Sequence, residues 1–386
     1  MLKDKVSNLG FFTLVKRFFA KKWIFKIKQK VDVLIMDDGF ANLSLNKICK
    51  YKQLGRELYI FPLIFSLFDL FFSKEKKNLI LLKKLYLKHR IKLFDPKIAI
   101  GHEINNSIFY FKKFFPEKLS IVYQFGNYFE IHKAYAQERF EGAVMDYFLV
   151  WDEWHKNFFN FVNTKNYIVS GSVKNNEIKD EPAEKVYDIM FISSFRTPVK
   201  SYAGTNLNIG HMRSVDVANS YVARILSDYC EKKKKKITLA LVSNRKDKKE
   251  QIGKNFTRKD ELDFYKRDIK NFSVEDTDSI KLAKKSNLTI CVYSTLGPEL
   301  LSRGDKVLFL DIYHFISDLP FLPSKDGPFW YKGQDPNIIK NKIDFMLNLS
   351  NSEWHQLLQQ SNVAMKFDQN NEILKKLVSE KLKLGN

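Results

Sequence analysis

The sequence predicts two α/β domains in tandem, each built on a parallel sheet that helices cover on both faces. Short apolar, β-branched runs end in polar or glycine-bearing residues and alternate with longer amphipathic segments, which is the pattern of buried parallel strands. Strand–helix alternation of this kind indicates a covered parallel sheet. In the first half the predicted strands are VDVLIMDD (31–38), KIAIGHE (97–103), LSIVYQFG (119–126), DYFLVWDE (146–153) and NYIVSGS (166–172).

A polar, charged stretch, NNEIKDEPAEKVY (175–187), separates this half from a second series of strands. We therefore expect an N-terminal domain over residues 1–174, a C-terminal domain over 175–369, and a terminal helix over 370–386 that packs back on the body. Ligands of open α/β sheets bind beyond the carboxyl ends of the strands, so residues that directly follow a strand are the site candidates. The second series of strands comprises YDIMFISSF (187–195), KKITLALVSN (235–244), LTICVYST (288–295) and KVLFLD (306–311).

The chain is strongly basic, with 65 Lys and Arg against 44 Asp and Glu among 386 residues. This excess favours contact with polyanions such as nucleic acid, anionic lipid headgroups or phosphorylated substrates, although a composition rich in Lys, Asn, Ile and Phe accounts for part of it. Cys49, Cys230 and Cys291 lie far apart, a spacing that excludes a disulfide framework or a zinc site and suits a reducing cytosol.

We expect a cytoplasmic protein that is soluble or peripheral on the inner membrane, because no secretory signal is evident. The longest apolar run, residues 58–72, is too short to span a bilayer and carries Pro62 and Asp69, so it predicts a buried helix pair. Residues 11–30 interleave aromatics with Lys and Arg. They fit either a segment lying on an anionic membrane surface or a first helix packed on the body.

The segment VYSTLGPELLSRGDKVLFLD (292–311) carries the strongest chemical signal. A strand ends in Ser and Thr that can cap the next helix, whose free N–H groups can hold a phosphate, and Glu299 is placed to accept hydrogen bonds from ribose hydroxyls. An ordinary capped helix has the same pattern, so both interpretations stay open. The residues predicted to bind a nucleotide sugar are Ser294, Thr295, Leu296, Gly297, Glu299, Arg245, Ser193, Ser194 and Arg196.

This segment resembles the surface carbohydrate biosynthesis proteins, whose pattern is approximately STLGYExLxRGxK. Here the pattern stands as STLGPELLSRGDK, with Pro298 in place of an aromatic residue. Further similar pieces follow in the family's order, with Phe125 in place of an Asn. They are VDVLIMDDG (31–39), INNSIFYF (104–111), YQFGNY (123–128), VSGSVKNNE (169–177), MFISSFR (190–196), DELDFYK (260–266), DGPFW (326–330) and SNSEW (350–354).

The resemblance, which spans about residues 31 to 375, implies a GT-B fold in which two Rossmann-like domains face an interdomain cleft. It also implies kinship with transferases that use a CMP-activated ulosonic acid, typically CMP-Kdo, to build lipopolysaccharide or capsule. The first domain would bind the acceptor and the second the nucleotide sugar. A CMP-sugar needs no metal to neutralise a diphosphate, and the only DxD, Asp276–Asp278, falls in a polar loop, so we expect neither a cofactor nor a metal ion.

Relatives of the retaining β-Kdo transferases would form a covalent glycosyl–carboxylate intermediate, which requires a carboxylate nucleophile. Asp216, in the segment HMRSVD, is the candidate, with His211 as a substrate-binding neighbour. An ordinary acid at the start of a helix would look the same.

An inverting enzyme would need only a base to deprotonate the acceptor hydroxyl. Asp152 and Glu153 are the first candidates, and Asp37 and Asp38 are further ones. Each could instead cap the helix that follows it.

Lys174, Asn175 and Asn176 close the first domain and are predicted to bind substrate. The lysine could meet a carboxylate and the amides could hold sugar hydroxyls, while turn formation explains the two Asn equally well.

The sequence thus predicts a glycosyltransferase that moves Kdo or a related ulosonic acid to a surface glycan or glycolipid acceptor. Two alternatives remain. A polyol-phosphate transferase of the teichoic-acid type typically uses histidines in HG turns, and this chain has Phe125–Gly126 and no HG pair. A basic nucleic-acid-binding protein would concentrate Lys and Arg on one element with stacking aromatics, whereas the charges here are spread along the chain.

Overall fold

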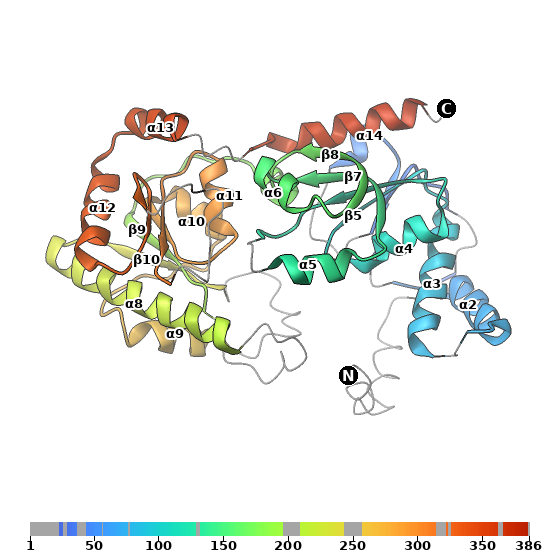
Figure 1. The fold of residues 1–386 in the computed structure, drawn as a ribbon, viewed down its shortest axis with the longest axis horizontal. Helices are drawn as coiled ribbons and strands as arrows, with labels where there is room; N and C mark the ends of the chain where they lie inside the picture. Colours follow the sequence, from blue (N-terminus) through green and yellow to red (C-terminus); the bar gives the residue numbers. More distant parts are fainter. Residues whose placement is uncertain are drawn as a thin grey trace. The chain divides into compact units, whose positions relative to one another are not determined.

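The computed structural model describes residues 23–25, 29–36, 44–55, 57–75, 78–128, 132–195, 209–242, 257–313, 322, 326–361 and 366–384. The chain forms two compact units. Unit 1 comprises Met1–Phe125, Tyr135–Lys179 and Lys366–Asn386, and unit 2 comprises Gly126–Ala134 and Asp180–Met365. Each unit is an α/β domain built on one six-stranded sheet (Figure 1). The predicted pair of α/β domains is therefore confirmed.

The sheet of unit 1 is wholly parallel and has the order β3-β2-β5-β6-β7-β8. The inner strands β2, β5 and β6 are apolar and almost wholly buried, as parallel strands covered on both faces must be, whereas the edge strands β3 and β8 are only partly covered. The strand order reverses beside β2, which has β3 on one side and β5 on the other. The strands are β2 (Val33–Ile35), β3 (Tyr51–Gln53), β5 (Ile98–His102), β6 (Leu119–Tyr123), β7 (Val144–Val150) and β8 (Asn163–Val169).

Helices cover this sheet, and the last helix of the chain is one of them. Leu374, Leu377 and Val378 of α14 (Glu372–Leu384) join one buried cluster with the side chains of β2, β5 and β6, and Figure 1 shows α14 running beside β7 and β8. The other elements of unit 1 are β1 (Trp23–Ile24), β4 (Leu58–Tyr59), η1 (Leu45–Lys47), α2 (Ile60–Phe72), α3 (Leu79–Phe94), α4 (Asn106–Phe114), α5 (Lys133–Phe140), α6 (Glu153–Phe158), α7 (Val173–Asn176) and η5 (Gln369–Asn371).

After unit 2 the chain returns to unit 1, where a polar contact between α7 and η5 holds the returning segment. Asn176 is fully buried and donates its amide hydrogens to the Ser170 carbonyl (2.9 Å) and to Asn371 Oδ1 (3.0 Å). Asn371 in turn donates to the Val173 carbonyl (2.9 Å). Gly171 has a positive φ of 74°, and a Cβ there would overlap the carbonyl oxygen of Lys366 where the returning chain crosses it.

The sheet of unit 2 has the order β10-β9-β11-β12-β14-β13, parallel except for the terminal pair β13–β14. Here too the order reverses beside the first strand, since β10 and β11 flank β9. The strands are β9 (Tyr187–Ile192), β10 (Ile237–Ala240), β11 (Ser286–Cys291), β12 (Val307–Asp311), β13 (Asp326–Gly327) and β14 (Trp330–Lys332). The helices are α8 (Ile209–Lys233), α9 (Arg258–Lys266), α10 (Ser279–Lys284), α11 (Leu296–Ser302), α12 (Pro336–Asn348) and α13 (Asn351–Gln360).

Two of the motifs near the C-terminus build the core of unit 2. Phe329 of DGPFW is fully buried, and its ring packs edge-on against Trp354 of SNSEW at 5.3 Å between centroids. The Trp354 indole donates to the Gly304 carbonyl (2.7 Å), which fixes the turn between α11 and β12. These motifs therefore join α13 to the sheet.

The prediction of a buried helix pair over residues 58–72 is wrong in two respects. The short strand β4 and one helix, α2, form there instead of two helices. The helix is also not buried, since Phe68, Phe71 and Phe72 are 63%, 69% and 66% exposed. An apolar run predicts burial, but hydrophobicity alone does not tell whether a given side of a helix is covered by the rest of the protein. Within the described part of the chain, no helix is both long and apolar enough to cross a membrane.

We predict that Gly171→Ala is far more destabilising than Gly142→Ala. Both glycines have positive φ, which costs an L-residue about 1–2 kcal/mol, but only at Gly171 does the added Cβ meet backbone. Overpacking adds about 1–3 kcal/mol, so we expect a loss of about 1–2 kcal/mol at Gly142 and about 2–5 kcal/mol at Gly171. Urea unfolding of the two variants measures this difference. Equal losses of unfolding free energy in the two variants would show that the close approach of the Lys366 carbonyl to Gly171 does not constrain the fold.

Candidate functional site

The reversal of strand order in unit 2 places two loops at one edge of the sheet. β9 and β11 pair in parallel, with Phe191 opposite Ile290, so the segments that follow them start side by side. Ser193 and Ser194 follow β9, and Ser294 and Thr295 follow β11. The Ser194 hydroxyl donates to the carbonyl of Tyr293, which ties the loops together. The structure therefore brings together four of the residues that the sequence selected, at the edge where open α/β sheets bind ligands.

The loop after β9 is held by a buried polar network, which we call the Ser193 network. The Ser193 hydroxyl donates to Glu261 Oε1, and the backbone amide of Val242 donates to the same oxygen (2.8 Å). The Tyr265 hydroxyl lies 3.0 Å from Ser193 Oγ and 3.4 Å from Asn219 Oδ1. The hydroxyls of Ser193 and Ser194 are thus used inside the protein, where they position the strand-end loops.

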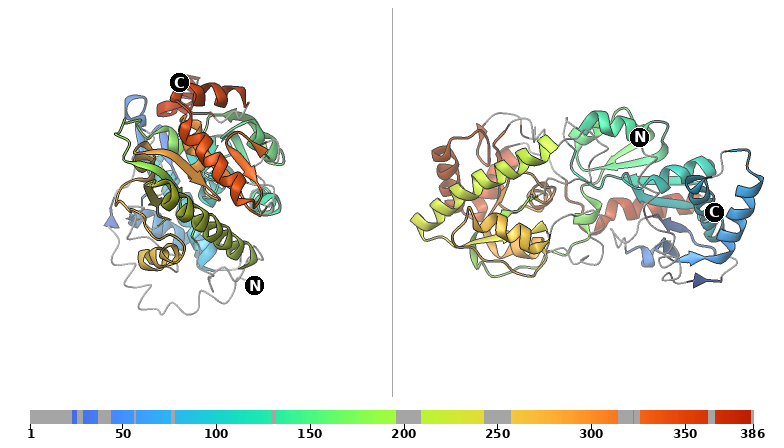
Figure 2. Two further views of the ribbon diagram at one scale, coloured as in Figure 1. Left: turned by 90° about the vertical axis from the view of Figure 1, so that its left-hand side faces the viewer. Right: turned by 90° about the horizontal axis from the view of Figure 1, so that it is seen from below.

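Glu261 and Tyr265 are functional candidates that the sequence prediction missed. They lie four residues apart on α9, so both face the sheet, and both are fully buried. The available signal was the ExxFY element within DELDFYK. α8 and α9 lie side by side in Figure 2, and a hydrogen bond from Ser220 to Asp268 (2.6 Å) joins α8 to the segment that directly follows α9.

Asp216 lies near this network. Burial raises the pKa of the Tyr265 hydroxyl far above its ordinary value, and the charges of Glu261 and Asp216 raise it further. Asp216 is half-buried on α8, three residues before Asn219 and on the same face. The Tyr265 hydroxyl is protonated at neutral pH and donates a hydrogen bond to Ser193 Oγ within this network.

The start of α11 differs in detail from the predicted cap. Thr295, the N-cap residue, has a right-handed helical conformation and makes no side-chain cap bond, whereas the amide of Leu296 donates to Ser294 Oγ (3.2 Å). Gly297 is needed because a Cβ there would lie 2.5 Å from Cys291 Sγ. Glu299 is half-buried in the first turn of this seven-residue helix.

Asp311, at the end of β12, adds a buried carboxylate to the same edge. In the sequence this residue is recognisable only as the end of a predicted strand. Cys291, beneath α11, is a free thiol whose pKa burial raises to about 12, so it is unreactive at neutral pH. Within the described residues, no three His, Cys, Asp or Glu side chains are grouped closely enough to hold a metal ion.

In unit 1, Asp152 is used as a helix cap. Its Oδ1 accepts hydrogen bonds from the His155 backbone amide (2.8 Å) and lies 2.9 Å from His155 Nδ1, and both side chains are buried. Glu153 is exposed in the first turn of α6 and pairs with Lys156 (3.1 Å). The DTD motif behaves similarly, since Asp278 caps α10 through the amide of Ile280 (2.9 Å).

The three substrate-binding candidates at the end of the first domain belong to α7. Asn175 and Asn176 are buried, Lys174 is half-buried, and Asn176 makes the contacts to the returning chain described above. Asn176 therefore serves the fold. Arg196, Arg245, Asp37 and Asp38 lie outside the described residues, as does the side chain of His211.

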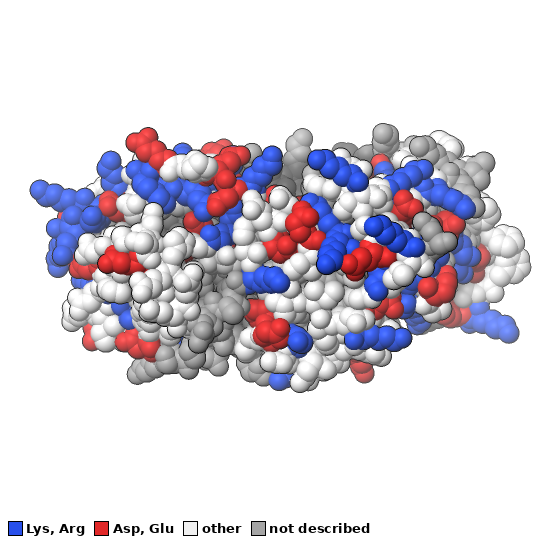
Figure 3. All heavy atoms as spheres, turned by 90° about the horizontal axis from the view of Figure 1, so that it is seen from above, with Lys and Arg blue, Asp and Glu red and all other residues white. Residues whose placement is uncertain are grey.

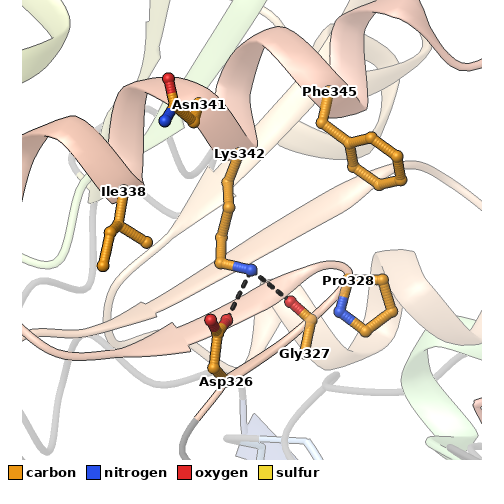
Figure 4. A pocket seen from close by; sticks show the side chains of 7 residues that line it. All are labelled: Asp326, Gly327, Pro328, Ile338, Asn341, Lys342 and Phe345. Carbon is orange, nitrogen blue, oxygen red and sulfur yellow. Dashed lines mark hydrogen bonds and ion pairs between the residues drawn. The ribbon is translucent and has the colours of Figure 1, made fainter.

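Not every pocket of unit 2 lies at the strand-end site. One pocket of unit 2, about 500 Å³, lies between β13 and α12, where Lys342 pairs with Asp326 and donates to the Gly327 carbonyl (Figure 4). β13 is the outermost strand, four places from β9 in the sheet. We therefore base the candidate site on the strand order and on the Ser193 network.

We predict that Glu261→Ala lowers the free energy of unfolding by about 2–3 kcal/mol. The change leaves the Ser193 hydroxyl and the Val242 amide buried without their acceptor. Asp263→Ala is the matched control, because Asp263 lies on the same helix with its side chain 53% exposed and should cost less than about 0.5 kcal/mol. Similar losses in urea unfolding would show that the network does not hold the loop.

Comparison with known structures shows the fold type. A UDP-N-acetylglucosamine 2-epimerase matches with a TM-score of 0.54 and 12% identity, over 94% of this chain and 96% of that chain. The UDP-GlcNAc 2-epimerase from Neisseria meningitidis, bound to UDP-GlcNAc, matches at 0.52 and 12%, over 93% and 100%. The chain covers 60% of the matched chain in a GtfA/B complex, with 78% of its own length, a TM-score of 0.40 and 12% identity. Both epimerase matches show two Rossmann-like domains of the GT-B type.

Sequence comparison gives the family. No curated protein matches the chain. The family described as "putative O-antigen biosynthesis protein" matches residues 121–382, which is more than half of the chain. The match runs from β6 to α14 and so includes most of the motifs quoted from the sequence. It confirms that the chain resembles proteins of surface carbohydrate biosynthesis. The chain belongs to this O-antigen biosynthesis family.

Proposed function

We propose that this chain is a glycosyltransferase of surface glycan synthesis that holds a nucleotide sugar at the carboxyl edge of the unit 2 sheet. The observation that carries the proposal is the reversal of strand order beside β9, where residues about 100 positions apart are brought to one edge. Membership of an O-antigen biosynthesis family and the GT-B type of fold support it. The acceptor would be a glycan or a glycolipid of lipopolysaccharide or capsule.

The proposed donor site uses side chains that the scaffold leaves half-buried. Thr295 and Glu299, which follow β11, are such residues, and Glu299 would accept hydrogen bonds from ribose hydroxyls. Arg196 and Arg245 would supply positive charge for the phosphate. The donor we propose is CMP-Kdo or a related CMP-activated ulosonic acid, because its monophosphate leaving group requires no metal ion.

For the reaction itself we propose a retaining mechanism with Asp216 as nucleophile. The carboxylate would attack the anomeric carbon, the bond from that carbon to the phosphate oxygen would break, and the acceptor hydroxyl would then displace Asp216. The charge of Asp216 raises the pKa of the Tyr265 hydroxyl, so the two groups lie close enough to interact electrostatically. An inverting reaction would instead use Asp152 or Glu153 as base, with Lys174, Asn175, Asn176 and His211 as the further substrate-binding candidates.

The charge distribution favours this proposal over a nucleic-acid-binding protein. On the face shown in Figure 3, Lys and Arg are spread widely and interspersed with Asp and Glu. Among the described residues, many Lys and Arg side chains form ion pairs, as Lys284 does with both Asp180 (2.8 Å) and Asp305 (2.7 Å). A surface that binds a nucleic-acid backbone would instead present a basic stripe.

We predict that CMP raises the melting temperature and that Glu299→Ala removes the shift. A ligand at about 100 times its Kd stabilises the folded state by about 2.7 kcal/mol. The measurement is thermal unfolding against CMP, CDP, UDP, GDP and UDP-GlcNAc, with Asp263→Ala as a variant that should keep the shift. A shift with diphosphonucleosides alone would contradict a CMP-sugar donor. No shift with any nucleotide would contradict nucleotide-sugar binding altogether.

We also predict that Asp216→Asn lowers transfer from CMP-Kdo by at least about 1,000-fold while CMP still stabilises the protein. The amide keeps the shape of the side chain but is a far weaker nucleophile, so binding survives and the chemical step does not. Single-turnover assays of Asp216→Asn and Asp152→Asn measure the two candidates side by side. Near-normal transfer by Asp216→Asn, with loss in Asp152→Asn, would indicate the inverting reaction.

A further inference from the structure

Helix α2 presents its apolar side to solvent. Its buried residues are Pro62 and Ser66, and the Ser66 hydroxyl donates to the Pro62 carbonyl. Large apolar side chains cover the opposite side and continue onto the start of α3, each between 45% and 69% exposed. They are Ile64, Phe65, Leu67, Phe68, Phe71, Phe72, Leu79 and Ile80, which we call the α2 apolar face. A surface helix of a protein surrounded by water has the reverse arrangement.

The α2 apolar face is a concentrated patch. Among the described residues, sixteen large apolar side chains are exposed, and eight of them fall within these 17 positions. The others are mostly scattered, as single exposed apolar residues are on most proteins. The Phe68 and Phe72 rings lie 4.7 Å apart and the Phe71 and Phe72 rings 5.1 Å apart, so they form a continuous surface. Contiguous exposed apolar surface marks a docking site for a partner or a membrane.

Polar contacts hold α2 against α3 in this orientation. Asp69 pairs with His89 Nε2 (2.9 Å) and with Lys88 Nζ (3.5 Å), and the Tyr86 hydroxyl accepts a hydrogen bond from the backbone amide of Tyr59 (2.9 Å). Figures 1 and 2 show the two helices lying side by side at an edge of unit 1. The outward direction of the phenylalanines is therefore built into the fold.

The charge of this hairpin identifies its partner. Residues 60–94 contain eight Lys and Arg but only two acidic residues, Asp69 and Glu75. Apolar aromatics bordered by Lys are the pattern of a helix that lies in the interface of an anionic bilayer. A second copy of the chain would bring two basic hairpins together, which repel. The 13 residues of α2 extend about 20 Å, too short to cross a hydrocarbon core of about 30 Å.

We propose that the α2–α3 hairpin docks this protein on an anionic lipid bilayer. α2 lies flat in the interface, with Phe65, Phe68 and Phe71 among the acyl chains, and the exposed Lys74 and Lys83 meet the headgroup phosphates. The proposal does not depend on the glycosyl transfer proposed above. It also places the membrane contact elsewhere than residues 11–30, most of which lie outside the described residues.

Vesicle cosedimentation tests the proposal with the full chain. We expect the wild type to bind vesicles that contain about 30% phosphatidylglycerol and to bind neutral phosphatidylcholine vesicles weakly. Phe68→Ser with Phe71→Ser should lower the partition coefficient at least about tenfold, because each removes a large apolar group from the acyl region. Phe345→Ser is the matched control, since Phe345 is 45% exposed on α12 of unit 2, and it should bind like the wild type. Lys74→Gln with Lys83→Gln should weaken binding to the anionic vesicles alone, since both lysines are exposed beside the α2 apolar face.

A fluorescent label then reports which helix enters the bilayer. The native thiols are hard to ionise, because burial raises the pKa of Cys49 to about 11 and of Cys230 and Cys291 to about 12. An environment-sensitive thiol probe on Phe71→Cys should therefore be selective, and its emission should shift to the blue when vesicles are added. The same probe on Phe345→Cys should not respond.

Three results would overturn the proposal. The first is equal vesicle binding by the wild type and the Phe68→Ser, Phe71→Ser variant, or no binding by either. The second is a probe at residue 71 that is already blue-shifted without vesicles, which would mean that another part of the chain covers the face. The third is a wild-type dimer in light scattering that the double variant converts to a monomer without any vesicle binding, which would make a second copy the partner.

Discussion

Parallel strands of one sheet all present their carboxyl ends at the same edge, and this constraint determines where each unit can bind a ligand. In unit 2 the chain adds β10 on one side of β9 and then returns to add β11 on the other. The loops after β9 and β11 therefore start side by side although about 100 residues separate them. Unit 1 repeats the arrangement, with β3 and β5 on the two sides of β2. The strand order thus determines both the fold of each unit and the position of its candidate site.

Loops at such an edge must be held, and both units use a buried glutamate. Glu261 accepts hydrogen bonds from Ser193 and the Val242 amide, and Glu103, also fully buried, accepts one from the Phe125 amide (2.7 Å) at the end of β6. A buried carboxylate is costly unless donors surround it, so each glutamate favours one loop conformation over the alternatives. Burial raises the pKa of the nearby Tyr265 hydroxyl, and the charges of Glu261 and Asp216 raise it further.

Periodicity predicted the two sheets because strand burial leaves a direct mark in the sequence, as in KIAIGHE and KVLFLD. It also led to Ser193, Ser194, Ser294 and Thr295, since the rule for carboxyl ends needs only the end of each strand. Periodicity could not show that the Ser193 hydroxyl donates a hydrogen bond inside the protein, because its acceptor Glu261 lies 68 positions away on α9. Nor could hydrophobicity show which side of α2 faces solvent. That depends on the tertiary contacts of Asp69 with α3.

The motifs that reveal the family are largely parts of the scaffold. Asn176 of VSGSVKNNE holds the returning chain, Phe329 and Trp354 fill the core of unit 2, and Tyr265 of DELDFYK holds a strand-end loop. Packing constrains residues that are buried for such reasons, whatever sugar the protein uses. A resemblance at these residues is therefore stronger evidence for the fold than for the identity of the donor. Under the proposed function, donor choice then rests on the few side chains at the edge that the scaffold leaves half-buried, Thr295 and Glu299 above all.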